Sequence, residues 1–153
     1  YVTARSNTRL DGIPEWLSEN GFPRGPIHTG LEDATYWEAR ANKYDHISRI
    51  LDENPQQRFV LIGDTNHVDP DVFHDIIRDY SSQIIGAFVH KVRNISDTRS
   101  EGLLVFENYA EVAVSMSKSG IFSTEVALSI VDAARAEGLE LSDAEIEALL
   151  GDE

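Results

Sequence analysis

The amino-acid sequence predicts an α/β fold with a mostly parallel sheet. Two apolar runs of strand length, residues 58–63 and 84–92, flank a helical pattern over residues 70–80. A continuous apolar run is typical of a strand that helices cover on both faces. Strands that alternate with helices favour parallel pairing through crossover connections. We therefore expect a layered, Rossmann-like arrangement of helices around the sheet.

The elements before residue 58 continue this alternation. Residues 1–3 predict the end of a strand, and residues 14–20 predict a short helix because proline is favoured in a first helical turn. A short strand is expected around Ile27, followed by a charged loop over residues 30–41. Residues 43–53 have apolar side chains at helical spacing and predict the next helix.

The character of the chain changes after a polar linker that begins at Asn94. Three helical stretches are expected there, the first with Phe106 on its apolar face and the last with a capping box at residues 142–145. We interpret residues 1–93 as an α/β core and residues 94–153 as a helical appendage. The apolar faces of these helices must pack on the core or on a partner, and packing on the core is the simpler interpretation.

Composition excludes several classes of protein. The 153 residues include 27 acidic and 13 basic side chains, which gives a net charge of −14 and disfavours nucleic-acid binding. The chain has no cysteine, so disulfide and thiolate chemistry are excluded. No apolar run is long enough for a membrane span. These features are typical of a cytoplasmic protein, which is the location that we expect.

Four side chains are candidates for a functional site at the carboxyl ends of the strands, where open parallel sheets bind ligands. Thr3 ends the first strand, and its hydroxyl could hold a phosphate oxygen, although threonine is also common in strands. Lys43 falls in the first turn of a predicted helix. A cation there opposes the helix dipole unless an anion compensates it, and the alternative is a solvated surface lysine.

The other two candidates, Asp64 and Asp69, follow the strand over residues 58–63. Carboxylate oxygens are preferred Mg²⁺ ligands, and a site often uses only one or two of them. Asp64 could equally be a turn residue. Asp69 precedes Pro70 and could be a helix N-cap. His67 lies in the same loop, but the five histidines show no zinc-binding spacing, and the chain has no P-loop, GxSxG or GxGxxG motif.

Taken together, these residues resemble three of the four motifs of the haloacid dehalogenase (HAD) superfamily of phosphatases, in the family's order. The segment that begins "YVTARSNT" resembles the second motif, Lys43 in "NKYDHISRIL" the third, and "VLIGDTNHVDPDVF" the fourth. With "GFPRGP" and "IIGAFVHKV", the chain looks most like the catalytic domain of actin-patch-type phosphatidate phosphatases. The resemblance covers roughly residues 1–93.

The resemblance implies Mg²⁺-dependent hydrolysis of a phosphomonoester through an aspartyl-phosphate. Thr3 would hold the phosphoryl group and Lys43 would neutralise its charge. Asp64 would bind Mg²⁺, and Asp69 would orient Lys43 or the metal shell. The substrate is expected to be a phosphorylated small molecule or a lipid. The phosphatidate phosphatases favour a lipid, whereas "TARSNT" departs from their Ser-Asn-Ser-Pro type stretch and its "TAR" is closer to the small-molecule phosphatases of the superfamily.

The family's first motif, a strand that ends in Asp-x-Asp and supplies the nucleophile, is absent from this sequence. In the family fold that strand lies between the strand of Thr3 and the strand over residues 59–62, so the sheet is expected to split there. We therefore expect the parent protein to have further sequence before Tyr1, and this chain alone to be inactive. The alternative is a non-catalytic binding or interaction module with the same fold.

Overall fold

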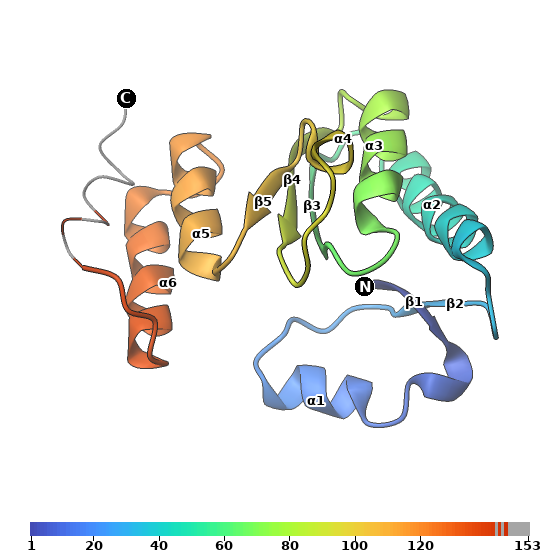
Figure 1. Cartoon of the computed structure of the whole chain (residues 1–153), viewed down its shortest axis with the longest axis horizontal. Coiled ribbons are helices and arrows are strands. Elements are labelled where there is room, and N and C mark those ends of the chain that lie inside the picture. Colours follow the sequence, from blue (N-terminus) through green and yellow to red (C-terminus); the bar gives the residue numbers. More distant parts are fainter. Residues whose placement is uncertain (143, 145, 147–153) are drawn as a thin grey trace.

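The structure, a computed structural model, describes residues 1–142, 144 and 146. Strands and helices alternate along the first two thirds of the chain (Figure 1). The strands are β1 (Val2–Ser6), β2 (His28–Gly30), β3 (Phe59–Asp64), β4 (Ile84–His90) and β5 (Leu104–Phe106). The helices are the 3-10 helix η1 (Asn7–Arg9), α1 (Ile13–Glu19), α2 (Tyr36–Glu53), α3 (Asp69–Asp79), α4 (Asp97–Ser100), α5 (Tyr109–Lys118) and α6 (Thr124–Ala136).

The described strands form two separate parallel sheets. One sheet pairs β1 with β2, and the other has the order β3-β4-β5. The prediction of an α/β fold with parallel strands is confirmed. β1 and β3 lie in different sheets, which is the split expected between these two strands. The three-layer HAD-like arrangement of a single sheet stays a prediction.

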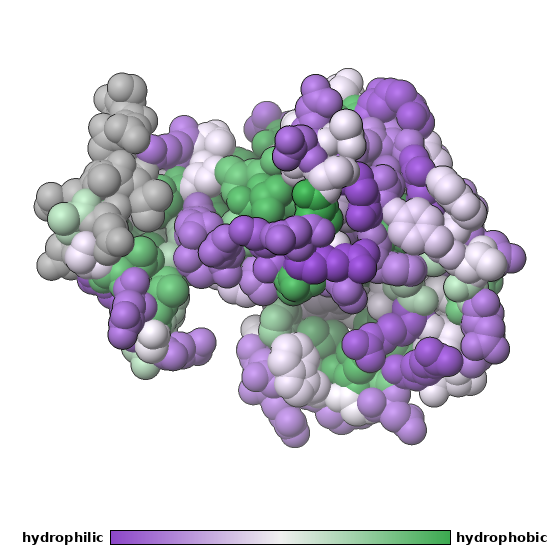
Figure 2. All heavy atoms as spheres, viewed as in Figure 1, coloured by the Kyte–Doolittle hydropathy of each residue, from purple (hydrophilic) through white to green (hydrophobic). Residues whose placement is uncertain are grey.

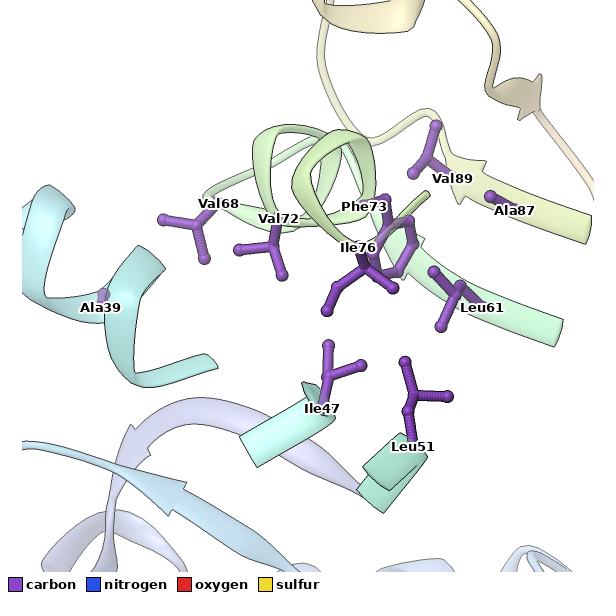
Figure 3. Close-up of a cluster of buried hydrophobic side chains, with 10 residues drawn as sticks. All are labelled: Ala39, Ile47, Leu51, Leu61, Val68, Val72, Phe73, Ile76, Ala87 and Val89. Carbon is purple, nitrogen blue, oxygen red and sulfur yellow. The ribbon is translucent and has the colours of Figure 1, made fainter. Parts of the chain in front are cut away.

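The main hydrophobic core lies between α2, α3 and the sheet of β3 and β4 (Figure 3). Apolar side chains of α3 face those of α2 and β3 because α3 repeats them at helical spacing. Leu51, Val72 and Ile76 are almost completely buried. Val2 and Ala4 of β1 pack against the edge of the same cluster. The core therefore fixes α2, α3 and β3, the three elements that carry Lys43, Asp69 and Asp64.

Helix α2 begins earlier than the sequence predicts. Residues 30–41 were expected to form a loop, but Thr35 caps a helix that starts at Tyr36. The Thr35 hydroxyl accepts the Glu38 N–H, and the Glu38 carboxylate accepts the Thr35 N–H in return, which is a capping box. Lys43 consequently lies about two turns inside the helix. The expectation that it opposes the dipole in a first turn is wrong.

The segment after residue 94 was predicted to be helical, but it also contains the strand β5. β5 extends the sheet by pairing with β4, so Phe106 belongs to a strand rather than to a helix face. α5 packs on this sheet through Phe88, Phe106 and Met116, and α6 packs on α5 through Val131. The interpretation that these helices pack on the core is therefore confirmed for α5. The predicted capping box at residues 142–145 lies partly outside the described residues.

Candidate active site

A cavity of about 370 Å³ lies between β1 and the loop that joins β3 to α3. Figure 2 shows the surface hollowed between the lobe that carries α1, at the bottom of the view, and the rest of the molecule. The lining of the cavity includes Thr3 from β1, Lys43 from α2, and Asp64 and Asp69 from the β3–α3 segment. The structure thus brings all four predicted site residues to one cavity, from three separate parts of the chain.

Lys43 and Asp69 form a close ion pair at the floor of this cavity. The Lys43 Nζ lies 2.5 Å from the Asp69 Oδ1, and each side chain is only 11% exposed. The second carboxylate oxygen of Asp69 accepts a hydrogen bond from the backbone N–H of Asp64, at 3.2 Å. Both oxygens therefore hold other parts of the site. The alternative of Asp69 as the N-cap of α3 is wrong, since Val68 occupies that position and no side chain caps the helix.

Gly63 makes the close approach of Asp69 possible. A Cβ atom at Gly63 would lie 2.9 Å from the Cβ and Cγ atoms of Asp69, which is closer than real carbon atoms pack. The glycine has ordinary backbone angles, so it is required here for space and not for conformation. The Gly-Asp sequence at the end of β3 thereby lets the Asp69 carboxylate reach the backbone of Asp64.

Asp64 is the last residue of β3 and pairs with His90 of β4 in the register of the sheet. Its Oδ1 accepts the Asn66 N–H at 2.7 Å, which closes a tight turn. No protein group donates to its Oδ2 among the described residues. A role in a turn was the alternative to metal binding in the sequence analysis, and Asp64 does form that turn. The turn uses Oδ1, so Oδ2 remains available for a ligand in the cavity that Asp64 lines.

The donor set fits a Mg²⁺ ion that takes few protein ligands. No group of three or more histidine, aspartate or glutamate side chains is arranged to hold a metal within the described part of the chain. Mg²⁺ commonly binds one or two carboxylates and completes its shell with water and substrate phosphate. Asp64 can supply one such carboxylate, whereas Asp69 is already engaged by Lys43 and by the Asp64 backbone.

Thr3 lies near the beginning of β1, because the strand continues to Ser6. The expectation that Thr3 ends the strand is therefore wrong by three residues. Its Oγ1 accepts the N–H of Arg5 at 3.2 Å, which leaves the hydroxyl hydrogen free to donate. The carboxyl end of β1 delivers Ser6, which is buried and lines the same cavity.

Several polar side chains of the cavity, among them Arg5, Arg9 and Asn66, were not singled out from the sequence, whereas His67 was noted there. Arg5 and Arg9 line its β1 side, and Asn66 and His67 line the opposite side. His67 shares the loop of Asp64, which the motif spacing indicated. The two arginines were missed because the sequence predicted a polar loop after Thr3, whereas Arg5 lies in β1 and Arg9 in η1.

The comparisons with known proteins give the class of this chain as a phosphatase catalytic domain. Residues 1–91 match the family model of "Phosphatidate phosphatase APP1, catalytic domain". The chain belongs to this family, and the resemblance drawn from its motifs is confirmed. No curated protein and no solved structure matches the chain. Among the described residues, no helix combines the length and apolar character that crossing a membrane requires.

Proposed function

We propose that this chain provides the phosphoryl-binding and charge-neutralising part of a Mg²⁺-dependent phosphatase of the HAD-like type. The observation that carries this proposal is the convergence of Thr3, Lys43, Asp64 and Asp69 on one cavity, in a chain of the phosphatidate phosphatase family. Hydrolysis through an aspartyl-phosphate needs groups that bind the phosphoryl oxygens and offset their charge. The cavity offers a hydroxyl, an ammonium and a carboxylate for these tasks.

Each residue has a role that its contacts support. Thr3 would donate its hydroxyl hydrogen to a phosphoryl oxygen. Lys43 would place its positive charge next to the phosphoryl group, held there by the 2.5 Å contact with Asp69. Asp64 would hold Mg²⁺, which when bound offsets negative charge on the transferring oxygens. Asp69 would then act as a positioning residue for Lys43.

The nucleophile would come from a strand seated between the two sheets. Among the described strands, β1 pairs only with β2 and β3 pairs only with β4, so each has an open edge. A groove of about 180 Å³ is lined by Val2 of β1, by Phe59–Ile62 of β3, and by apolar side chains of α2. Lys43 lines both this groove and the cavity. A strand in the groove that ends in Asp-x-Asp would bring an aspartate to the site, and without it we expect no turnover.

The substrate that we propose is a phosphomonoester, either of a lipid such as phosphatidate or of a small molecule. Residues 1–91 match a phosphatidate phosphatase family, which favours a lipid. The "TARSNT" segment, which places Arg5 at the cavity and is followed directly by Arg9, favours a small polar phosphate. Parallel assays with phosphatidate in mixed micelles and with a soluble phosphomonoester distinguish the two.

The test of the proposed function compares Asp64→Asn with Asp33→Asn in a form of the protein that includes an Asp-x-Asp strand. Both aspartates line the cavity, but the side chain of Asp33 is exposed, and within the described part of the chain its ion-pair partner is the exposed Arg9. We expect Asp64→Asn to lower Mg²⁺-dependent phosphate release on the order of 100-fold or more, because one metal-facing charge is lost. Asp33→Asn should stay near the unmodified rate.

Equal rates for the two variants would contradict the role of Asp64. Absence of any Mg²⁺-dependent turnover in the Asp-x-Asp form would favour the non-catalytic binding module instead. Turnover by residues 1–153 alone would contradict the need for a further strand.

A further inference from the structure

The loop between β3 and α3 is held by residues that follow β4. Thr65, directly after Asp64, is completely buried. Its hydroxyl donates to the Arg93 carbonyl at 2.7 Å and accepts the Val92 and Arg93 N–H groups at 3.1 and 3.0 Å. The Arg93 side chain returns to the loop, where its Nε donates to the Thr65 carbonyl at 3.0 Å. One end of the loop is thus fixed by side-chain and backbone contacts.

A second arginine holds the middle of the same loop. The Nη2 of Arg99, in α4, donates to the His67 carbonyl at 2.7 Å and to the Asp71 Oδ2 at 2.6 Å. The Nε of Arg99 also donates to Asp71, at 3.0 Å, and the Tyr36 hydroxyl donates to the same carboxylate oxygen. The guanidinium therefore joins the loop to the first turns of both α3 and α2.

We propose that Arg99, assisted by Arg93, is a positioning residue of the candidate active site that sets the geometry of the loop from Asp64 to Asp69. Both arginines lie beyond residues 1–91, the part of the chain that matches the family. The catalytic consequence rests on the proposed function, but the effect on the loop does not. The segment after β4 is then part of the site's construction.

The shape of the loop explains why this positioning matters. Asp64 and Asp69 stand at its two ends and contact each other through the Asp64 N–H, so a shift of the residues between them changes that contact. The Thr65 and His67 carbonyls, which lie between these two ends, accept hydrogen bonds from Arg93 and Arg99. A charged guanidinium binds a carbonyl more strongly than a neutral donor, and its planar fork can serve several acceptors at once.

Amide hydrogen exchange, measured by NMR on residues 1–153, tests the proposal without any requirement for activity. The reporters are the Asp64 and Asn66 amides, because their acceptors are the Asp69 and Asp64 carboxylates. We expect Arg99→Ala to speed exchange at both on the order of tenfold, since charge-assisted hydrogen bonds are lost. Arg93→Ala should have a smaller effect, because the backbone contacts of residue 93 to Thr65 remain.

Two further variants separate positioning from general stability. Arg99→Lys keeps the charge but lacks the planar fork, so it should restore only part of the protection. Arg78→Ala is the matched control, because Arg78 bonds two carboxylates of α3, Asp75 and Asp79, and none of the loop. It should leave the two reporter amides unchanged.

Unchanged reporter amides in Arg99→Ala would overturn the proposal. So would a uniform increase that includes Leu61 and the rest of the β3–β4 ladder, since that is global destabilisation. An active form adds one readout: Arg99→Ala should raise the Mg²⁺ concentration needed for half-maximal rate. If Asp64→Asn keeps full activity while Arg99→Ala loosens the loop, the proposed function fails and the positioning role stands.

Discussion

The two walls of the candidate active site are held in different ways. The first wall, formed by Lys43 and the loop from Asp64 to Asp69, is anchored by buried residues, among them Thr65 and Asp69. Lys43 and Asp69 are each 11% exposed at a separation of 2.5 Å. The second wall, formed by residues 3–9, carries exposed charges. Arg9 and its partner Asp33 are 68% and 84% exposed and lie 3.6 Å apart.

This difference follows from what lies behind each wall. The first wall is supported by the main core and by the segment after β4, so its charged groups are set before any ligand arrives. The second wall belongs to a two-stranded sheet in which β1 and β2 each have an open edge among the described strands. Preset charges suit the stabilisation of a transferring phosphoryl group, whereas exposed arginines suit the initial capture of an anion. The predictions below test this contrast.

The same substitution, aspartate to alanine, should have its largest effect on the first wall. Asp69→Ala leaves the Lys43 ammonium buried without its partner, which costs about 3 kcal/mol of unfolding free energy. Asp33→Ala removes an exposed partner and places alanine in a left-handed backbone conformation, at φ 46°, so it should cost about 1 kcal/mol, which is still well below the cost of Asp69→Ala. Urea unfolding of both variants, followed by circular dichroism, gives the two values. If the two losses agree within error, the walls do not differ in the way that we describe.

Glycine-to-alanine changes should separate the walls by a smaller amount. At Gly63 the added methyl group meets Asp69 at 2.9 Å, so the close-packed first wall must shift, at a cost of about 1–3 kcal/mol. Gly25 lies in the loop that precedes β2, the strand that pairs with β1. There the methyl group meets ring carbons of Tyr1 at 3.7 and 3.9 Å, which is ordinary contact, and the effect on stability should be near zero. A Gly63→Ala protein with unchanged stability would show that Asp69 can move to make room for the methyl group at little cost in free energy.

The sequence predicted β3, α3 and β4 better than the start of α2 and β5. The strand over residues 58–63, the helix over residues 70–80 and the strand over residues 84–92 emerged within a few residues of β3, α3 and β4, because their apolar patterns are long and regular. The start of α2 was missed, since its capping box lies in a polar segment and its first turn exposes Trp37. β5 was missed because three apolar residues fit a helix face as well as a strand.

The residues of the candidate site that occupy motif positions could be predicted from the sequence. The residues whose side chains bind backbone atoms of the loop could not. Lys43 and Asp69 were expected to interact, and they do. Arg93 and Arg99 donate hydrogen bonds to loop carbonyls. Every residue has a backbone carbonyl, so the residue type does not show which carbonyl an arginine will contact. Their partners lie 28 and 32 residues away, beyond the reach of any local pattern.

The smallest expected effect is a pH dependence of the stability that Asp71, in α3, contributes by holding Arg99 next to the first wall. Burial raises the pKa of Asp71, but the Arg99 guanidinium and the Tyr36 hydroxyl lower it by more, so the pKa lies below its ordinary value of 3.8. A carboxyl group whose pKa is lowered in the folded state contributes stability above its unfolded pKa. This stability is lost as the pH falls from about 3.8 through the folded pKa.

We therefore expect Asp71→Asn to be destabilised relative to the unmodified chain by about 1 kcal/mol near neutral pH, as for a half-buried ion pair. The difference should be constant from about pH 7 to 5 and should shrink below about pH 4, since the protonated Asp71 no longer holds Arg99 as an ion pair. Urea unfolding of both proteins across this range measures the difference. A difference that stays constant down to about pH 3 would show that the charge of Asp71 does not support the loop, and that Arg99 is held by its other contacts.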